Sequence, residues 1–293
     1  MRGSPLRVLV LLAIVLTALV RIAATADAER FRFCVLGDRT GEAQPGIYEQ
    51  VWREVAAENP AFVISVGDTI QGMHDVSAEA EWMKVEQLLK PYRRFPIYLT
   101  PGNHDIWSAG SEQLFVKHAG HAPRYSFDHG AAHFTILDNS RSEQFSAEDL
   151  AFLEKDLKAH EAQPAKFIFS HRPSWLMNVA LRNPNFTLHQ LARKYKVQYV
   201  IAGHVHQMLR FELEGVTYLS MASSGGHLRA SQDYVAGWFF AHSLVEVRGP
   251  GIHFQIEELK PPHGSGRVTQ PTDWGMLGLL EKSKAASAPG TAR

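Results

Sequence analysis

A set of acid, amide and imidazole side chains occurs directly after short apolar runs, at positions where it could bind metal ions. Its members are Asp38, Asp68, Asn103, His104, His171, His204 and His206. Oxygen and imidazole ligands without a thiolate suit Mn, Fe, Zn or Ni rather than a structural zinc site. The set exceeds what one four-coordinate ion requires, so we expect two ions. Two cations about 3.5–4 Å apart can clamp a tetrahedral phosphoryl group for in-line attack.

The elements that must position these side chains are expected to be buried strands. Apolar runs that end at Gly, Ser or Pro predict strands over residues 31–36, 62–66, 96–100, 166–169 and 197–202. Helical patterns lie between them, over residues 47–58, 78–89, 147–160 and 187–195. Strands that alternate with helices predict βαβ units, and ligands of such sheets bind outside the carboxyl ends of the strands. The candidate ligands should therefore converge at one edge.

The remaining segments carry different patterns. A hairpin is predicted around Asp128-His129-Gly130. After residue 206 the helical patterns stop, and runs over residues 208–213, 216–222, 238–247 and 252–257 predict a β meander. From Pro261 onward the chain is rich in Pro, Gly, Ser, Ala and Lys, so residues 261–293 are predicted to form a flexible tail, although Trp274–Leu280 could dock on the body.

The first 26 residues have the pattern of a secretory signal peptide. Arg2 and Arg7 precede an uncharged apolar run over residues 8–20, and small residues with an Ala-x-Ala site follow Arg21. We therefore expect export to the periplasm or the extracellular space. The alternative is an uncleaved membrane anchor, which would require tilt or neighbouring residues to extend the span.

Composition excludes several classes of protein. The chain has 293 residues, 45% of them hydrophobic, with 30 Lys and Arg against 30 Asp and Glu and a single Cys. These values are not those of a disordered chain or a disulfide scaffold. The signal-peptide segment contains Arg and no acidic residue, so the mature chain is slightly acidic. We expect no nucleic-acid-binding surface, because such surfaces carry a basic surplus, and we predict no stable protein partner.

The blocks that hold the candidate ligands also resemble a known family. Gly37-Asp38, Gly67-Asp68, Gly102-Asn103-His104-Asp105, Ser170-His171 and Gly203-His204-Val205-His206 are similar to the ordered motifs of the calcineurin-like metallophosphoesterases. The likeness extends more distantly to purple acid phosphatases and cyclic-nucleotide phosphodiesterases. It covers roughly residues 31–258. It implies one domain over residues 27–260, an α/β four-layer α/β/β/α sandwich of two mixed β-sheets flanked by helices, with the metal site at the carboxyl ends of the strands.

The resemblance also implies a role for each candidate ligand. Asp68 would bridge two divalent or trivalent ions. Asp38 and His206 would bind the first ion. The second ion would be bound by Asn103, His171 and His204. His104 would protonate the leaving oxygen or stabilise charge in the transition state, and a hydroxide between the ions would attack. The implied function is an exported phosphoesterase that cleaves a phosphomonoester or phosphodiester.

Two positions depart from the family pattern. Thr40 stands where the first block usually has a metal-binding His. Gln71 stands where purple acid phosphatases have a Tyr and protein-phosphatase relatives have an Asp that supports the catalytic His. The first metal site therefore lacks one strong ligand, and the alternative function is a metal- or phosphate-binding protein whose hydrolytic activity has decayed. Arg39 and Arg172 adjoin ligands and are candidates either to bind phosphate or to form salt bridges.

Substrate identity stays open at this point. Monoesters, diesters, cyclic nucleotides, phospholipids and phosphoproteins all suit the implied chemistry, because the residues that choose among them lie on variable loops.

Overall fold

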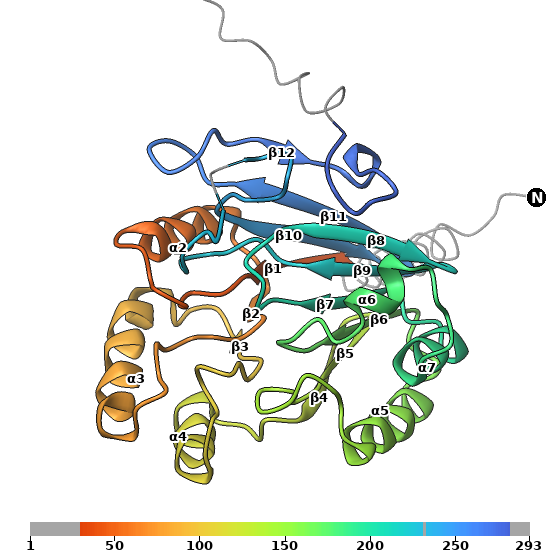
Figure 1. Ribbon diagram of the computed structural model, residues 1–293, viewed down its shortest axis with the longest axis horizontal. Coiled ribbons are helices and arrows are strands. Elements are labelled where there is room, and N and C mark those ends of the chain that lie inside the picture. The colour runs from red at the N-terminus through yellow and green to blue at the C-terminus, as the bar shows by residue number, and fades with distance from the viewer. Residues whose placement is uncertain (1–29, 231–232, 282–293) are drawn as a thin grey trace, which may run out of the picture.

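Two mixed six-stranded β-sheets lie face to face in the computed structural model, which describes residues 30–230 and 233–281. The strand orders are β12-β11-β10-β1-β2-β3 and β4-β5-β6-β7-β9-β8. Helices α2, α3 and α4 cover the outer face of the first sheet, and α5, α6 and α7 cover that of the second (Figure 1). The predicted α/β/β/α sandwich is therefore confirmed. The predicted signal peptide, residues 1–26, lies outside the described residues.

The first sheet places the carboxyl ends of β1 and β2 side by side. Its strands are β1 (Arg30–Leu36), β2 (Phe62–Ser65), β3 (Ile97–Tyr98), β10 (Ala241–Arg248), β11 (Gly251–Glu258) and β12 (Val268–Thr269). Strands β1, β2 and β3 are parallel, with Leu36 opposite Ser65, whereas β10 pairs antiparallel with β1. The segments that carry Asp38, Asp68 and Asn103 consequently leave the same edge.

The second sheet contains a parallel core of four strands. Its strands are β4 (Tyr125–His129), β5 (Ala132–Ile136), β6 (Ala165–Phe169), β7 (Tyr199–Ala202), β8 (Leu209–Leu213) and β9 (Val216–Ser220). Strands β5, β6, β7 and β9 run parallel, and β4 and β8 pair antiparallel at the two edges. His171 follows β6, and His204 and His206 follow β7, so these imidazoles also leave one edge.

Over residues 30–230 and 233–281, the helices include the four predicted from sequence and two that were not predicted. The helices are α2 (Ile47–Glu58), α3 (Asp75–Leu89), α4 (Ala109–Ala119), α5 (Ala147–Ala159), α6 (Leu176–Ala180) and α7 (Thr187–Lys194), with 3₁₀ turns η1 (Lys90–Tyr92) and η2 (Pro271–Asp273). The missed α4 begins at a Ser108 N-cap, whose hydroxyl accepts from the Ser111 main-chain N–H. Its Ala-Gly-Ser start is a weak helix signal, and tertiary contacts with α3 compensate for it.

Aromatic side chains fill the space between the sheets. The rings of Phe33 and Phe62 from the first sheet stack 4.9 Å apart, and those of Phe134 and Phe167 from the second sheet stack 5.0 Å apart. Phe33 meets Phe134 edge-on at 5.2 Å across the interface. All four are fully buried. Such rings bury large apolar areas in defined geometries, so they fix the position of one sheet on the other.

The C-terminal half differs from the prediction in two ways. Strands β8 and β9 join the second sheet and β10 and β11 the first, so the expected meander is two hairpins in different sheets. Periodicity identifies strands but does not reveal which sheet a hairpin joins. The predicted flexible tail, residues 261–293, is described as far as residue 281, and residues 282–293 lie outside the described part of the chain. The described segment packs on the body in agreement with the docking alternative, because Trp274 and Leu280 are buried in the core between the sheets. The apolar surface of these two side chains accounts for the docking.

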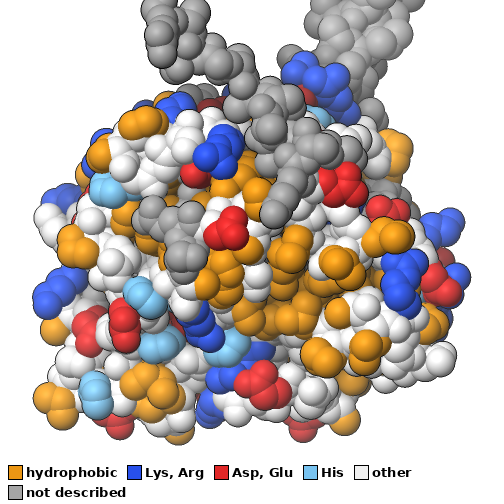
Figure 2. Space-filling view, turned by 45° about the horizontal axis from the view of Figure 1, so that its top comes forward, with side chains coloured by type: hydrophobic (Ala, Val, Ile, Leu, Met, Phe, Trp, Pro, Cys, Tyr) orange, Lys and Arg blue, Asp and Glu red, His pale blue; other side chains and the backbone are white. Residues whose placement is uncertain are grey.

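The outer edge of β8 is covered in part by neighbouring segments. The Arg210 N–H donates to the Gly278 carbonyl at 3.0 Å, and Arg182 Nη1 donates to the Glu212 carbonyl at 2.8 Å. These bonds reduce the capacity of the edge strand to pair with another chain. Figure 2 shows hydrophobic side chains gathered on one face of the body. Exposed large hydrophobic residues of the segments beside β8 are Met177, Leu181, Met276 and Leu277.

A buried histidine is held between two carboxylates at the end of the second sheet opposite the predicted site. His133 Nδ1 lies 2.7 Å from Asp128 Oδ1, and its Nε2 lies 2.8 Å from Asp156 Oδ2. The ring of His160 stacks on His133 with 3.8 Å between centroids and 13° between planes. Nearly parallel rings cannot both direct an in-plane lone pair at one ion, so we interpret this cluster as an ion-pair network. Burial opposes protonation of His133, but Asp156 and Asp128 outweigh it and raise its pKa.

His133→Gln is expected to destabilise the fold mainly at mildly acidic pH. A raised pKa in the folded state contributes stability that is complete below the unfolded value, about 6.5, and is lost as pH rises through the folded-state pKa. Breaking a buried ion pair costs about 3 kcal/mol. Chemical unfolding of wild type and variant at pH 5.5 and pH 9 measures this difference. A stability gap that widens toward pH 9 would contradict the prediction.

Candidate metal centre

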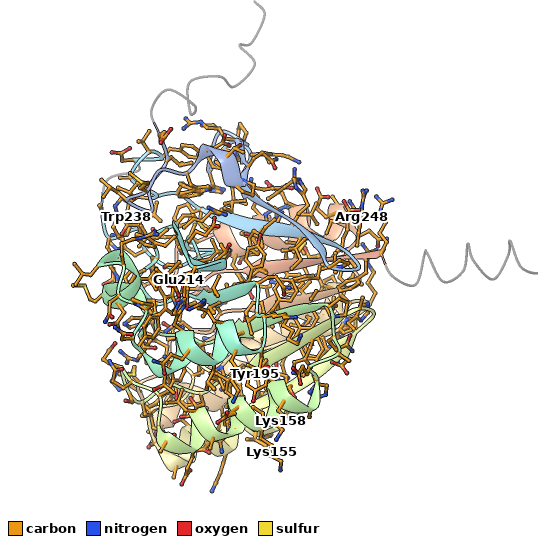
Figure 3. The ribbon with its side chains drawn as sticks, turned by 90° about the vertical axis from the view of Figure 1, so that its right-hand side faces the viewer. Lys155, Lys158, Tyr195, Glu214, Trp238 and Arg248 are labelled. Atoms are coloured by element: carbon orange, nitrogen blue, oxygen red, sulfur yellow. The ribbon has the colours of Figure 1, made fainter. Side chains whose placement is uncertain are left out.

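The carboxyl ends of the parallel strands in both sheets point toward one end of the body. Trp238 lies toward that end in Figure 3, and Arg248, the last residue of β10, lies at the opposite end. The loops after β1, β2 and β3 bring Asp38, Asp68 and Asn103 to this end, and the loops after β6 and β7 bring the imidazoles. The structure thus brings together all the candidate ligands that the sequence indicates.

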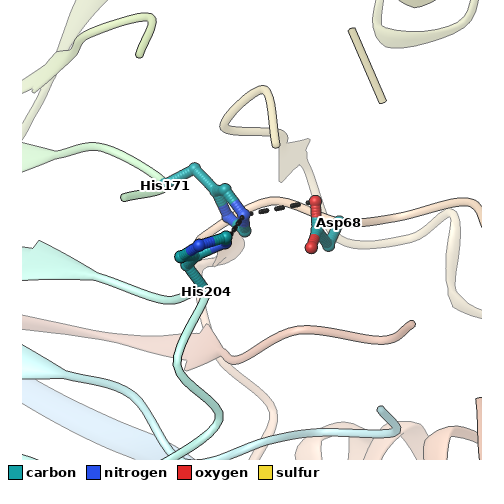
Figure 4. Close-up of side chains that lie close together, drawn as sticks. All are labelled: Asp68, His171 and His204. Atoms are coloured by element: carbon teal, nitrogen blue, oxygen red, sulfur yellow. Dashed lines mark hydrogen bonds and ion pairs between the residues drawn. The ribbon is translucent and has the colours of Figure 1, made fainter. Parts of the chain in front are cut away.

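One group of candidate ligands surrounds the Nε2 atom of His171. This nitrogen lies 3.2 Å from Asp68 Oδ1 and 3.2 Å from His204 Nδ1 (Figure 4). It also lies 3.1 Å from Asn103 Oδ1. His171 Nδ1 donates to the Val66 carbonyl at 2.8 Å, so Nε2 carries the lone pair of the neutral ring. Ligand atoms about 3.3 Å apart are what tetrahedral coordination requires with metal–ligand bonds near 2.0–2.1 Å. The donor set therefore fits a four-coordinate ion.

A second group consists of Asp38, Asp68 and His206, and all three are buried. His206 Nδ1 donates to the His227 carbonyl at 2.7 Å, which leaves Nε2 as the free nitrogen, 3.9 Å from Asp38 Oδ1. Asp68 belongs to both groups. A carboxylate shared by two sets of ligands is the arrangement that a pair of neighbouring ions requires.

His104 lies beside the shared carboxylate. Its main-chain N–H donates to Asp68 Oδ1 at 2.9 Å, and its Nε2 lies 4.0 Å from Asp68 Oδ2. Its Nδ1 donates to the main-chain carbonyl of Gln71. Position 71 therefore supports the imidazole although it has no acidic side chain. Sequence reasoning missed this contact because a main-chain carbonyl has no signature in the residue type.

The two positions that depart from the family pattern contact each other. The hydroxyl of Thr40 donates to Oε1 of Gln71, and the Glu42 N–H donates to the same oxygen at 3.2 Å. Thr40 is fully buried. The Thr40 hydroxyl therefore uses its proton in a hydrogen bond to the Gln71 side chain. The second group of ligands then consists of Asp38, Asp68 and His206.

Charge within the centre favours a cation. Burial opposes protonation of His171, but Asp68 and Asp38 raise its pKa to about 9. Burial raises the pKa of Asp38, whereas the neighbouring His171 and His104 hold that of Asp68 low against the effect of burial. Burial, with the nearby His171 and Arg172, lowers the pKa of His204 to about 3. The buried carboxylates thus attract positive charge, which a metal ion supplies when it replaces the proton.

The backbone at the centre is strained. Asp68, His204 and His206 have φ angles of 54°, 71° and 60°, in the left-handed region that non-glycine residues rarely adopt. Strain of this kind persists where surrounding contacts hold it, and it is common at functional sites. Close packing adds a further constraint, because a Cβ atom on Gly203 would lie 2.6 Å from Asp38 Oδ2. The surroundings therefore fix the position of these ligands.

Asp105 joins the loops that follow β2 and β3. Its Oδ1 accepts from the N–H groups of Thr69 and Ile70 at 2.8 and 3.1 Å, and its Oδ2 accepts from that of Gly102 at 2.9 Å. Burial and the charge of Asp68 raise the pKa of Asp105 to about 7, although the three N–H donors lower it. Asp105 therefore fixes the position of the loop that carries Asp68 relative to the loop that carries Asn103. Sequence reasoning did not assign this role.

Asn139 plays a similar part for the loop after β6. Its Oδ1 accepts from the N–H groups of His171 and Arg172 at 3.1 and 3.0 Å, and its Nδ2 donates to the Arg172 carbonyl at 2.8 Å. On the other sheet, the N–H groups of Ser224 and Gly226 donate to the Asp38 carbonyl. Polar residues at the ends of buried strands were the available signal for Asn139, since it follows β5.

Thr40→His is expected to increase the affinity for the first ion, the one assigned to Asp38 and His206. The variant adds an imidazole at the position where the family pattern has a metal-binding His. Metal titration followed by calorimetry should show a lower dissociation constant for the weaker ion. Thr40→Val is the matched control, since it removes the hydroxyl without adding a ligand. Equal dissociation constants for the two variants would show that another group completes this site.

The fold and the donor set together define a metal-binding α/β/β/α sandwich. The sequence model of the calcineurin-like phosphoesterases matches residues 21–208, and the chain belongs to this family.

Two curated relatives are cyclic-nucleotide phosphodiesterases. The 3',5'-cyclic adenosine monophosphate phosphodiesterase CpdA of Haemophilus influenzae is 25% identical over 180 residues, which are 57% of this chain and 63% of the relative. The 3',5'-cyclic-nucleotide phosphodiesterase alr5338 of Nostoc sp. is 29% identical over 136 residues, 43% of this chain and 50% of the relative. The matched region therefore spans less than two thirds of either relative.

Solved structures show the same fold. Purple acid phosphatase PPD1 from yellow lupin (Lupinus luteus) seeds superposes with a TM-score of 0.62 at 17% identity, over 82% of this chain and 53% of that one. GAP50, described as the anchor in the inner membrane complex of Plasmodium, gives a TM-score of 0.58 at 16% identity, over 87% of this chain and 90% of that one. At these identities the likeness concerns the fold alone.

Proposed function

We propose that this protein is a metal-dependent phosphoesterase that hydrolyses a phosphodiester. The observation that carries the proposal is the convergence of Asp68, Asn103 and His204 on Nε2 of His171, each with a polar atom 3.1–3.2 Å from it, and the sharing of Asp68 with a second group. Acceptors gathered in this way repel one another unless a proton or a metal ion lies between them. The family to which the chain belongs uses such centres on phosphoesters, and the relatives named for cyclic nucleotides favour a diester.

Residues of the chain have separate roles in this proposal. Asp38 and His206 would hold one ion, Asn103, His171 and His204 the other, and Asp68 both. Ions bound there supply a hydroxide nucleophile at neutral pH and neutralise phosphoryl charge. His104 moves the proton: its Nδ1–H is fixed on the Gln71 carbonyl, so its Nε2 is the atom that exchanges a proton with the leaving oxygen.

The second candidate function is a metal- or phosphate-binding protein with decayed activity. It is favoured by the Thr40–Gln71 contact, which leaves the first ion with few protein ligands. A panel of phosphoesters separates the two functions: a cyclic nucleotide, an aryl phosphodiester and an aryl phosphomonoester, each with Mn, Fe, Zn or Ni. Turnover of a diester supports the phosphodiesterase. Tight metal binding without turnover of any ester supports the decayed form.

We also propose that the protein is exported, on the basis of the signal-peptide pattern at residues 1–26. In the part of the chain that the structure describes, no helix has the length and apolar character of a membrane span. N-terminal sequencing of the protein recovered from cell fractions tests the cleavage.

A further inference from the structure

Arginine side chains near the centre differ in what they contact. Arg39 is directed away from the ligands: its Nη1 donates to the Thr69 carbonyl at 3.0 Å, and its guanidinium lies over the ring of Tyr48. Arg229 is exposed and donates to the His204 carbonyl at 2.9 Å. Of these three arginines, Arg172 is the one whose guanidinium contacts the imidazole of a candidate ligand, since its Nη1 lies 3.4 Å from Nε2 of His204. The structure thus separates Arg172 from Arg39, which sequence alone did not.

When a cation is bound, His204 cannot accept a hydrogen bond from Arg172. His204 faces the other acceptors with Nδ1, which lies 3.2 Å from His171 Nε2. A neutral imidazole that binds a cation through Nδ1 carries its proton on Nε2 and cannot accept there. The N–H of Arg172 that points toward His204 is then left without an acceptor on that side. It is available to an anion at the centre.

Arg172 is held at its main chain and at Nε, whereas its counter-ion is largely exposed. Asn139 binds the main-chain N–H and the carbonyl of Arg172, and Arg172 Nε donates to the Ser140 carbonyl at 3.3 Å. The side chain of Arg172 is 17% exposed, whereas that of its ion-pair partner Glu143 is 68% exposed. An exposed carboxylate adds little stability to such a pair. Arg172 is therefore a fixed cation whose partner is readily displaced.

We propose that Arg172 binds an oxygen of the substrate phosphate and that Glu143 is the counter-ion which the phosphate displaces. This inference rests on the proposed phosphoesterase function of the same centre. A guanidinium forms charge-assisted, often bidentate hydrogen bonds to phosphate, stronger than a bond to a solvated carboxylate. Because Glu143 competes for the guanidinium, it also weakens the binding of the phosphate product and assists its release.

Equilibrium binding of inorganic phosphate to the metal-loaded protein tests this inference without requiring turnover. Arg172→Ala should weaken binding about 10- to 100-fold, as expected for loss of a charge-assisted hydrogen-bond pair. Glu143→Gln should tighten it several-fold, since the competing charge is gone. Arg141→Ala is the matched control. Arg141 lies in the same loop as Glu143, but it forms its ion pair with Glu112 instead, with 2.6 Å between Nη2 and Oε2. It should leave phosphate binding unchanged.

Arg172→Ala and Glu143→Gln are expected to change the affinity for phosphate in opposite directions, and this difference separates phosphate binding from a structural role. If Glu143→Gln weakens phosphate binding as Arg172→Ala does, the ion pair is structural and the inference is overturned. Loss of metal from Arg172→Ala, or unchanged phosphate binding by it, overturns the inference as well. A wild type that binds phosphate with the expected variant effects but hydrolyses no ester refutes only the proposed function. Normal hydrolysis with no effect of Arg172→Ala on phosphate binding refutes only this inference.

Discussion

Asp68→Ala is expected to yield a folded protein that has lost both ions and all phosphoesterase activity. Asp68 is the side chain common to the two groups of candidate ligands, and it is 2% exposed. Without a carboxylate between them, two cations a few ångströms apart repel each other strongly, by Coulomb's law. Metal analysis of the purified variant after dialysis, beside the wild type, measures the effect directly.

Asp68→Asn serves as the matched variant, because it keeps the shape of the side chain and removes its charge. We expect it to retain at most one ion, with activity also lost. The thermal unfolding transition of each variant shows whether the fold persists. Two ions per chain in either variant would place the bridge on another residue.

His104→Ala is expected to lower kcat by about 10²–10⁴-fold, the usual range for losing a proton-transfer group. The metal content should stay at the wild-type level, since Nε2 of His104 faces Asp68 at 4.0 Å without belonging to either group of ligands. Steady-state kinetics should be measured with two esters that differ in the pKa of the leaving alcohol. The loss should be smaller for an activated aryl leaving group, which needs little protonation.

His253→Ala provides the control for His104→Ala, because His253 is exposed on β11 in the first sheet, away from the ligand loops. It should keep wild-type kcat. Equal losses for both esters in the His104 variant would indicate that the imidazole stabilises charge on the phosphoryl group instead of protonating the leaving oxygen.

Sequence patterns identified the parts of the molecule whose residue types carry the signal. Asp38, Asp68 and the imidazoles end apolar strands, and because parallel strands end at a common edge, their convergence could be predicted. The contacts that orient them could not. The tautomers of His171, His206 and His104 are set by main-chain carbonyls, which any residue at positions 66, 227 and 71 would offer.

Elements stabilised by their surroundings were also beyond local patterns. Helix α4 has a weak start and packs against α3, and the strand predicted over residues 96–100 is confirmed but is shortened to the two residues that pair with β2. The hairpins after residue 206 were recognised as strands, but their distribution between the sheets depends on long-range pairing. Trp274 and Leu280 lie in a segment of tail-like composition, and only the apolar surface that receives them fixes their position.

The candidate ligands come from both layers of the sandwich, with Asp38, Asp68 and Asn103 on loops of the first sheet and His171, His204 and His206 on loops of the second. Bound ions would therefore cross-link the two sheets at one end, while the aromatic side chains join them along their faces. The metal centre would then join two halves of the chain, because one set of its ligands precedes residue 104 and the other follows residue 170. Any movement that slides one sheet over the other would pull the ligands apart. The packing of Phe33, Phe62, Phe134 and Phe167 therefore also sets the distance between the ligands of the first sheet and those of the second.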